Sequence, residues 1–76
     1  MLNKKFSFKG KMKFSLLDTV VLNEDLLMEG LSAGMVGAVV DVYCDPCEAY
    51  EIEFCDNLGK TIAMLALLPS QLNKQI

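Results

Sequence analysis

The sequence contains no histidine and no arginine in 76 residues. Without histidine, the side chain that titrates near neutral pH is missing, and every Ser-His or Cys-His catalytic pair is missing with it. Without arginine, no guanidinium fork is available for bidentate contacts to guanine or phosphate. We therefore expect that the protein is not an enzyme and that its main body does not bind nucleic acid.

Long apolar runs are also absent. The longest runs from Ile62 to Leu68, whereas a membrane-spanning helix needs about 20 apolar residues. Near the cationic N-terminus, Ser7 and Lys9 interrupt the phenylalanines Phe6 and Phe8, so no apolar core of a signal peptide follows. We expect no contact with a membrane and a cytoplasmic location.

The charges divide the chain into two parts. From residue 14 onward, ten carboxylates stand against Lys60 and Lys74, which gives this part a net charge of −8. Residues 1–13 contain no acidic residue, and we predict that they form a basic arm, either disordered or adding a strand. Residues 14–76 are expected to form one domain. Five of the seven lysines lie in the arm: Lys4, Lys5, Lys9, Lys11 and Lys13.

Apolar residues make up 53% of the chain. A domain of this size buries only about 60% of the surface that its unfolded chain exposes, so some apolar side chains must lie outside. A contiguous exposed apolar patch usually marks an interface. We therefore expect a protein partner or a homo-oligomer, the alternative being apolar residues scattered singly over the surface.

The order of apolar and turn-forming residues predicts short strands. The segment from Glu48 to Cys55 alternates, with Tyr50, Ile52 and Phe54 on one face, as in a half-buried antiparallel strand. We predict an all-β fold, a small barrel of about five antiparallel strands with a short C-terminal helical turn. The other expected elements are strands at 16–22, 34–43 and 60–66 and the helical turn at 69–72.

Glycines mark the expected corners of this barrel. Gly34 and Gly37 suit a positive φ angle or a close approach of two backbones. Gly59 ends the sequence Asp56-Asn57-Leu58-Gly59, which is typical of a hairpin turn. We predict that these three glycines shape structural turns.

The cysteines are the first candidates for chemistry. Cys44 and Cys47 form a CxxC pair in a turn, and Cys55 follows eight residues later. A structural zinc site needs four cysteine or histidine ligands, and a redox CxxC pair needs a helix N-terminus that lowers the thiol pKa. We therefore predict unpaired thiols, no metal and no cofactor, with a small metal or redox protein using Cys44 and Cys47 as an alternative.

Five apolar or aromatic residues are candidates for an interaction surface. The long loop that follows residue 22 carries three consecutive apolar side chains, and two tyrosines are expected nearby. Methionine and aromatic side chains are enriched at protein interfaces. The predicted surface consists of Leu26, Leu27, Met28, Tyr43 and Tyr50.

Four stretches of the sequence carry a resemblance to a known family. They are LLDTVVL, then G-L-x-x-G-x-x-G-A-V-V-D-V-Y, then E-A-Y-E-I-E-F, and finally D-x-x-G-K-T-x-A. From about Met12 to Leu72 the chain resembles a family of short bacterial proteins, domain of unknown function 4926. The resemblance implies an SH3-like barrel in which residues 34–43 are similar to the glycine-containing strand of KOW-type modules. It implies no catalytic residue.

Together these features favour a non-enzymatic protein-interaction module, accessory or antitoxin-like, that acts through an apolar surface. The first alternative is a KOW-type nucleic-acid-binding module that uses the lysine-rich arm. The second is the metal or redox protein that uses the CxxC turn.

Overall fold

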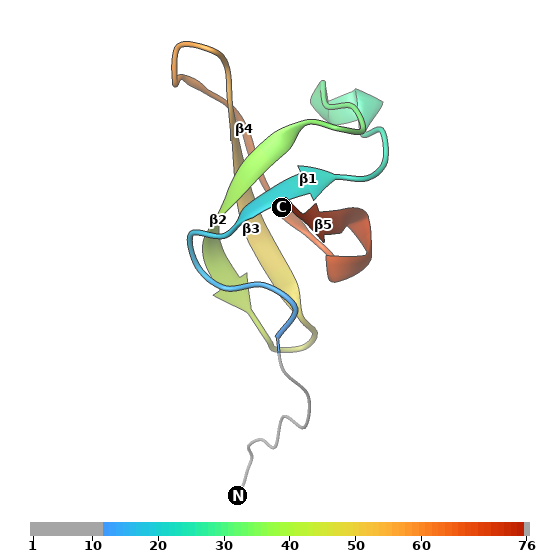
Figure 1. Ribbon diagram of the computed structural model, residues 1–76. Coiled ribbons are helices and arrows are strands. Elements are labelled where there is room, and N and C mark those ends of the chain that lie inside the picture. The colour runs from blue at the N-terminus through green and yellow to red at the C-terminus, as the bar shows by residue number, and fades with distance from the viewer. Residues whose placement is uncertain (1–11, 76) are drawn as a thin grey trace, which may run out of the picture.

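The computed structural model describes residues 12–75, which form one antiparallel sheet (Figure 1). The strands follow the order β4-β3-β2-β1-β5 across the sheet. The all-β class with five antiparallel strands is therefore confirmed. The strands are β1 (Thr19–Leu22), β2 (Val36–Tyr43), β3 (Ala49–Cys55), β4 (Thr61–Leu67) and β5 (Leu72–Lys74), with 3-10 turns η1 (Leu27–Glu29) and η2 (Pro69–Gln71).

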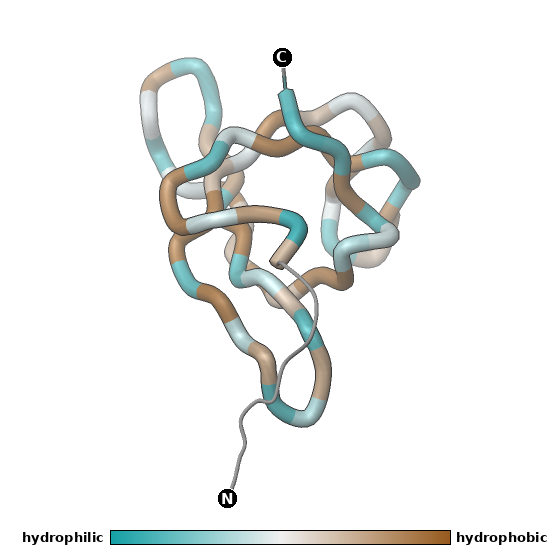
Figure 2. Tube along the Cα trace, turned by 60° about the horizontal axis from the view of Figure 1, so that its bottom comes forward, coloured by the Kyte–Doolittle hydropathy of each residue, from teal (hydrophilic) through white to brown (hydrophobic). Residues whose placement is uncertain are grey.

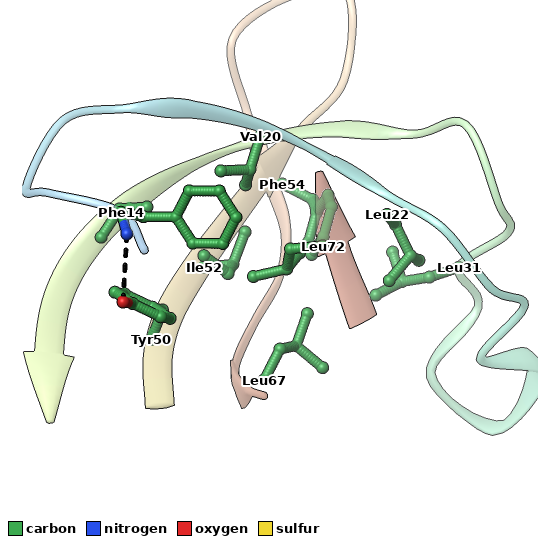
Figure 3. Packing of buried hydrophobic residues seen from close by; sticks show 10 residues of the cluster. Phe14, Val20, Leu22, Leu31, Tyr50, Ile52, Phe54, Leu67 and Leu72 are labelled. Atoms are coloured by element: carbon green, nitrogen blue, oxygen red, sulfur yellow. Dashed lines mark hydrogen bonds between the residues drawn. The ribbon is translucent and has the colours of Figure 1, made fainter. Parts of the chain in front are cut away.

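One apolar core lies on the concave side of the sheet (Figure 3). All five strands contribute buried side chains to it, which requires the sheet to curl until its two outer strands share the same interior. Leu67 of β4 and Leu72 of β5 are both members of the cluster, although these strands lie at opposite ends of the strand order. The buried residues are Phe14, Val20, Leu22, Leu31, Val39, Tyr50, Ile52, Phe54, Leu67 and Leu72.

The alternation expected for β3 is confirmed. Tyr50, Ile52 and Phe54 are fully buried, and the residues between them face outward. Hydrophobic and hydrophilic segments accordingly succeed one another along the traced strands (Figure 2). A half-buried strand needs this period of two, because successive side chains point to opposite faces.

The first strand is shorter than expected and begins at Thr19 rather than Leu16. Leu17 has a φ of 73°, which is incompatible with an extended strand. Asp18 stabilises this turn, because its carboxylate accepts a hydrogen bond from Ser15 N at 3.0 Å and its own N donates to Ser15 O at 3.1 Å. A local turn thus overrides the apolar run that suggested a longer strand.

The short strand β5 follows directly after the expected helical turn, η2. It pairs with β1, with Leu22 opposite Leu72 and Val20 opposite Lys74. Of the predicted arm, residues 1–13, which was expected to be disordered or to add a strand, residues 1–11 lie outside the described residues. Within the described residues, β5 is the fifth strand of the sheet.

The chain enters the domain through residues 12–14, at the end of the sheet where β3 begins (Figure 1). Lys13 N donates to Glu48 Oε2 at 2.9 Å, and Phe14 N donates to the Tyr50 hydroxyl at 3.1 Å (Figure 3). Phe14 packs edge-on against Tyr50, with the ring centroids 5.1 Å apart. Met12 and Lys13, which the sequence assigns to the arm, therefore contact the domain.

Gly34 and Gly59 adopt positive φ angles at turns, whereas Gly37, also predicted to shape a turn, lies within strand β2. Gly59 has a φ of 82° in the hairpin between β3 and β4, which projects from the body (Figures 1 and 2). Gly37 is needed for space, because a Cβ there would lie 2.6 Å from Ile52 Cγ2. Gly34 has a φ of 95° at the end of the loop that precedes β2.

Within residues 12–75, no helix has the length and apolar character required to cross a membrane.

Candidate interaction surface

The loop between β1 and β2 presents part of the predicted surface. Leu27 and Met28 lie on η1 with 78% and 99% of their surface exposed. Leu26 is half-buried instead and packs against the core, because its backbone pairs with Leu31. Only the tip of the three-residue apolar insert is therefore available to a partner.

The two tyrosines do not join this loop in one patch. Tyr43 is 39% exposed, but it ends β2, whereas η1 precedes the start of that strand. Seven residue steps of about 3.3 Å separate the two ends of β2 by roughly 23 Å. Tyr50 is fully buried, so its assignment to the surface is wrong: it lies on the inward face of β3, where its ring fills the core.

The edge of β4 is a surface that the sequence-based prediction missed. Within the described part of the chain, β4 pairs only with β3, so one side of its backbone has no hydrogen-bonding partner. The strand has seven residues with neither charge nor proline, the two features that commonly protect an edge from pairing with another chain. The opposite edge differs, because β5 has only three residues and carries Lys74.

The side chains of β4 are apolar on both faces of the sheet. Met64 and Ile62 lie on the outer side with 51% and 48% of their surface exposed. On the inner side, Ala63 and Leu65 pack against the core but are only half-buried. The core is therefore incompletely covered along this edge. The uninterrupted apolar run of β4 was the available signal, since a strand with one buried face must expose the other.

Next to β4, the outer face of the sheet is acidic. Glu51 and Glu53 of β3 stand opposite Ala66 and Met64 of β4, and Asp41 of β2 stands opposite Glu51. The Thr61 hydroxyl donates a hydrogen bond to Glu53. None of the strands β2, β3 and β4 contains a lysine, so this face has an unbalanced negative charge.

Tyr43 lies at the rim of this acidic face. Its hydroxyl donates to Glu51 Oε1 at 3.1 Å. This hydrogen bond, and then burial and the negative charges of Glu51 and Asp41, raise the pKa of Tyr43 above its ordinary value of 10.0. The hydroxyl therefore stays protonated at neutral pH and remains a hydrogen-bond donor.

A shallow groove crosses the same outer face. Its volume is about 220 Å³, which is smaller than the roughly 300–1,000 Å³ of a typical ligand pocket. Its lining residues are Thr19, Val36, Gly37, Ala38, Glu53 and Cys55.

All three cysteines lie at the surface of the domain. Cys44, Cys47 and Cys55 are all exposed free thiols. A search of residues 12–75 finds no group of three or more histidine, cysteine, aspartate or glutamate side chains positioned to hold a metal ion. Cys44 and Cys47 lie in the turn between β2 and β3, and neither belongs to one of the 3-10 turns η1 and η2.

The fold and surface define a small all-β domain with one uncharged open edge. The sequence model for the domain of unknown function DUF4926 matches residues 16–74. The chain therefore belongs to this family, as the resemblance suggested. No curated protein and no solved structure matches the chain.

Proposed function

We propose that the protein is a non-enzymatic protein-interaction module that binds an extended strand of its partner along the edge of β4. The open edge carries the proposal, because a strand with unpaired backbone groups is a template for another strand. Backbone hydrogen bonds then provide affinity, and the alternating side chains provide specificity.

The side chains around this edge support strand addition. Met64 and Ile62 offer apolar area on the outer side, and Met and aromatic residues are common at interfaces. Half-buried Ala63 and Leu65 offer apolar area on the inner side. A partner strand would thus cover apolar side chains on both faces of the sheet while pairing its backbone.

The charge of the surface favours a protein partner over nucleic acid. The outer face of β2, β3 and β4 carries carboxylates and no lysine, and negative charge repels a phosphate backbone. The strand order, with the 3-10 turn η2 before the last strand, supports the SH3-like barrel that the family resemblance implies. We place the protein in the cytoplasm, with a second protein or a second copy as the partner.

Site-specific photo-crosslinking tests the location of the interface. A photoreactive amino acid replaces Met64 on the β4 edge or, as the control, Met28 on η1, in cells that make the protein naturally. We expect an adduct of one defined mass from position 64 and none from position 28. An adduct of twice the chain mass would identify a second copy as the partner at the same edge.

A lysine substituted into the edge of β4 extends this crosslinking experiment. Ile62→Lys should reduce the adduct at position 64, because a lysine on an edge strand disfavours pairing. Leu27→Lys is the matched control and should leave the adduct unchanged. Equal adducts from positions 64 and 28, or no adduct from 64, would show that β4 is not the interface.

A further inference from the structure

We propose that residues 4–11 of the same chain lie along the edge of β4 as a sixth strand, with their lysines above the acidic outer face. This inference rests on the proposed function, since it assigns the same edge. Residues 4–11 would then occupy the edge of β4, and a partner strand must displace them before it binds there.

The place where the described chain begins supports this assignment. Lys13 Nζ donates to Pro69 O at 3.1 Å, at the start of η2, and to Leu72 O of β5 at 3.3 Å, while Phe14 N donates to the Tyr50 hydroxyl. Tyr50 stands opposite Leu67, the last residue of β4. The preceding residues are thus attached beside the C-terminal end of β4 and would run parallel to it when they follow its edge.

The lengths of the two segments also agree. At about 3.3 Å per residue step, the seven steps of residues 4–11 span roughly 23 Å and the six steps of β4 roughly 20 Å. No further linker is needed, because residue 11 is joined directly to Met12, which packs against the core. The short connection gives the segment an effective concentration near the edge of the order of millimolar.

The sequence of the segment matches the two faces of β4. In an extended strand, Phe6 and Phe8 share one face, and Lys5, Lys9 and Lys11 share the other. The phenylalanines would then cover half-buried Ala63 and Leu65, where the core is incompletely closed. The lysines would lie on the outer side of the sheet.

The charges on that outer side are complementary to the lysines. Glu51 stands opposite Ala66, whose short side chain leaves room for a lysine to reach across β4. Glu53 lies two residues further along β3 on the same face. These charges are close to solvent, so salt should weaken the contact.

Disulfide trapping in the full chain tests the proposal. The three exposed native cysteines are replaced by serine, and Ser7→Cys is combined with Met64→Cys or, to cover the neighbouring register, with Ala66→Cys. Adjacent strands are about 4.8 Å apart, within the Cα separation of a disulfide. We expect mild oxidation of a dilute sample to give an intramolecular disulfide in a monomer.

The control combines Ser7→Cys with Leu27→Cys on η1. Because docking holds the segment at β4, at least one β4 pair should close about tenfold faster or more than the control. Lys5→Glu with Lys9→Glu, or a high salt concentration, should remove this advantage. Equal rates for all pairs would overturn the proposal, and disulfides that join two chains would overturn its intramolecular form. If either of these two results were found, a photo-crosslinked adduct at position 64 would still support the proposed function.

Discussion

The Tyr50 side chain packs in the core and also binds the segment through which the chain enters the domain. Its ring is fully buried, while its hydroxyl accepts a hydrogen bond from Phe14 N and donates one to Glu48. Burial, followed by the Glu48 hydrogen bond, raises the pKa of Tyr50 above its ordinary value. The hydroxyl therefore remains protonated and satisfies a backbone N–H that has no strand partner.

Tyr50→Phe should lower the free energy of unfolding by about 1–3 kcal/mol, because the buried Phe14 N–H loses its acceptor. Urea unfolding measures the loss. Tyr43→Phe is the matched control, since that hydroxyl is exposed and its removal should change the stability by less than about 0.5 kcal/mol. Equal effects of the two substitutions would contradict the role given to Tyr50.

Glu48 makes the stability depend on pH. Hydrogen bonds from Tyr50 and from Lys13 N lower the pKa of Glu48 below its ordinary value of 4.5. A lowered folded-state pKa stabilises the fold above the unfolded-state pKa, and this contribution disappears as pH falls through the folded-state pKa. The unfolding free energy of the wild type should exceed that of Glu48→Gln above pH 4.5, and the difference should shrink below it. A difference that stays constant on acidification would refute this linkage.

Gly37→Ala tests the close approach of β2 and β3. The new Cβ would lie 2.6 Å from Ile52 Cγ2 and 3.0 Å from Glu53 O, so the strands must move apart. We expect a loss of about 1–3 kcal/mol in the unfolding free energy, as for other overpacked cores. The neighbouring Val36→Ala, on the exposed side, should cost clearly less. If Gly37→Ala left the unfolding free energy unchanged, β2 and β3 would have enough space between them for the added methyl group.

At the scale of the elements, β5 holds one end of the sheet through one buried side chain. Leu72→Ala should lower the unfolding free energy by about 2–5 kcal/mol, because Leu72 is fully buried opposite Leu22. Asn73→Ala, on the exposed face of the same strand, is the control and should cost less than about 1 kcal/mol. If both substitutions had equally small effects, β5 would not be part of the core-forming sheet.

Most strands could be predicted from the sequence, since local patterns specify them. The alternation of β3 and the glycine of its hairpin with β4 depend on neighbouring residues. Strand β5 could not be predicted, because three residues carry too little pattern and their pairing with β1 depends on distant residues. The start of β1 was misplaced, since the positive φ of Leu17 is imposed by a turn rather than by residue type.

At the scale of the whole molecule, the surface could be predicted only in part. The excess of apolar residues indicated that some must be exposed, and Leu27 and Met28 are exposed as expected. The open edge of β4 depends on the strand order, which no local pattern specifies. The burial of Tyr50 likewise follows from which face of β3 turns toward the core.

Amide hydrogen exchange in the full chain tests most directly whether the edge of β4 receives a strand. Alternate backbone amides of β4 point away from β3 and lack a partner within residues 12–75. If a strand binds along this edge, these amides should exchange as slowly as those paired with β3, and Lys5→Glu with Lys9→Glu should accelerate their exchange. Exchange of these amides at the rate of free amides in the unmodified chain would contradict the docking of residues 4–11 along β4.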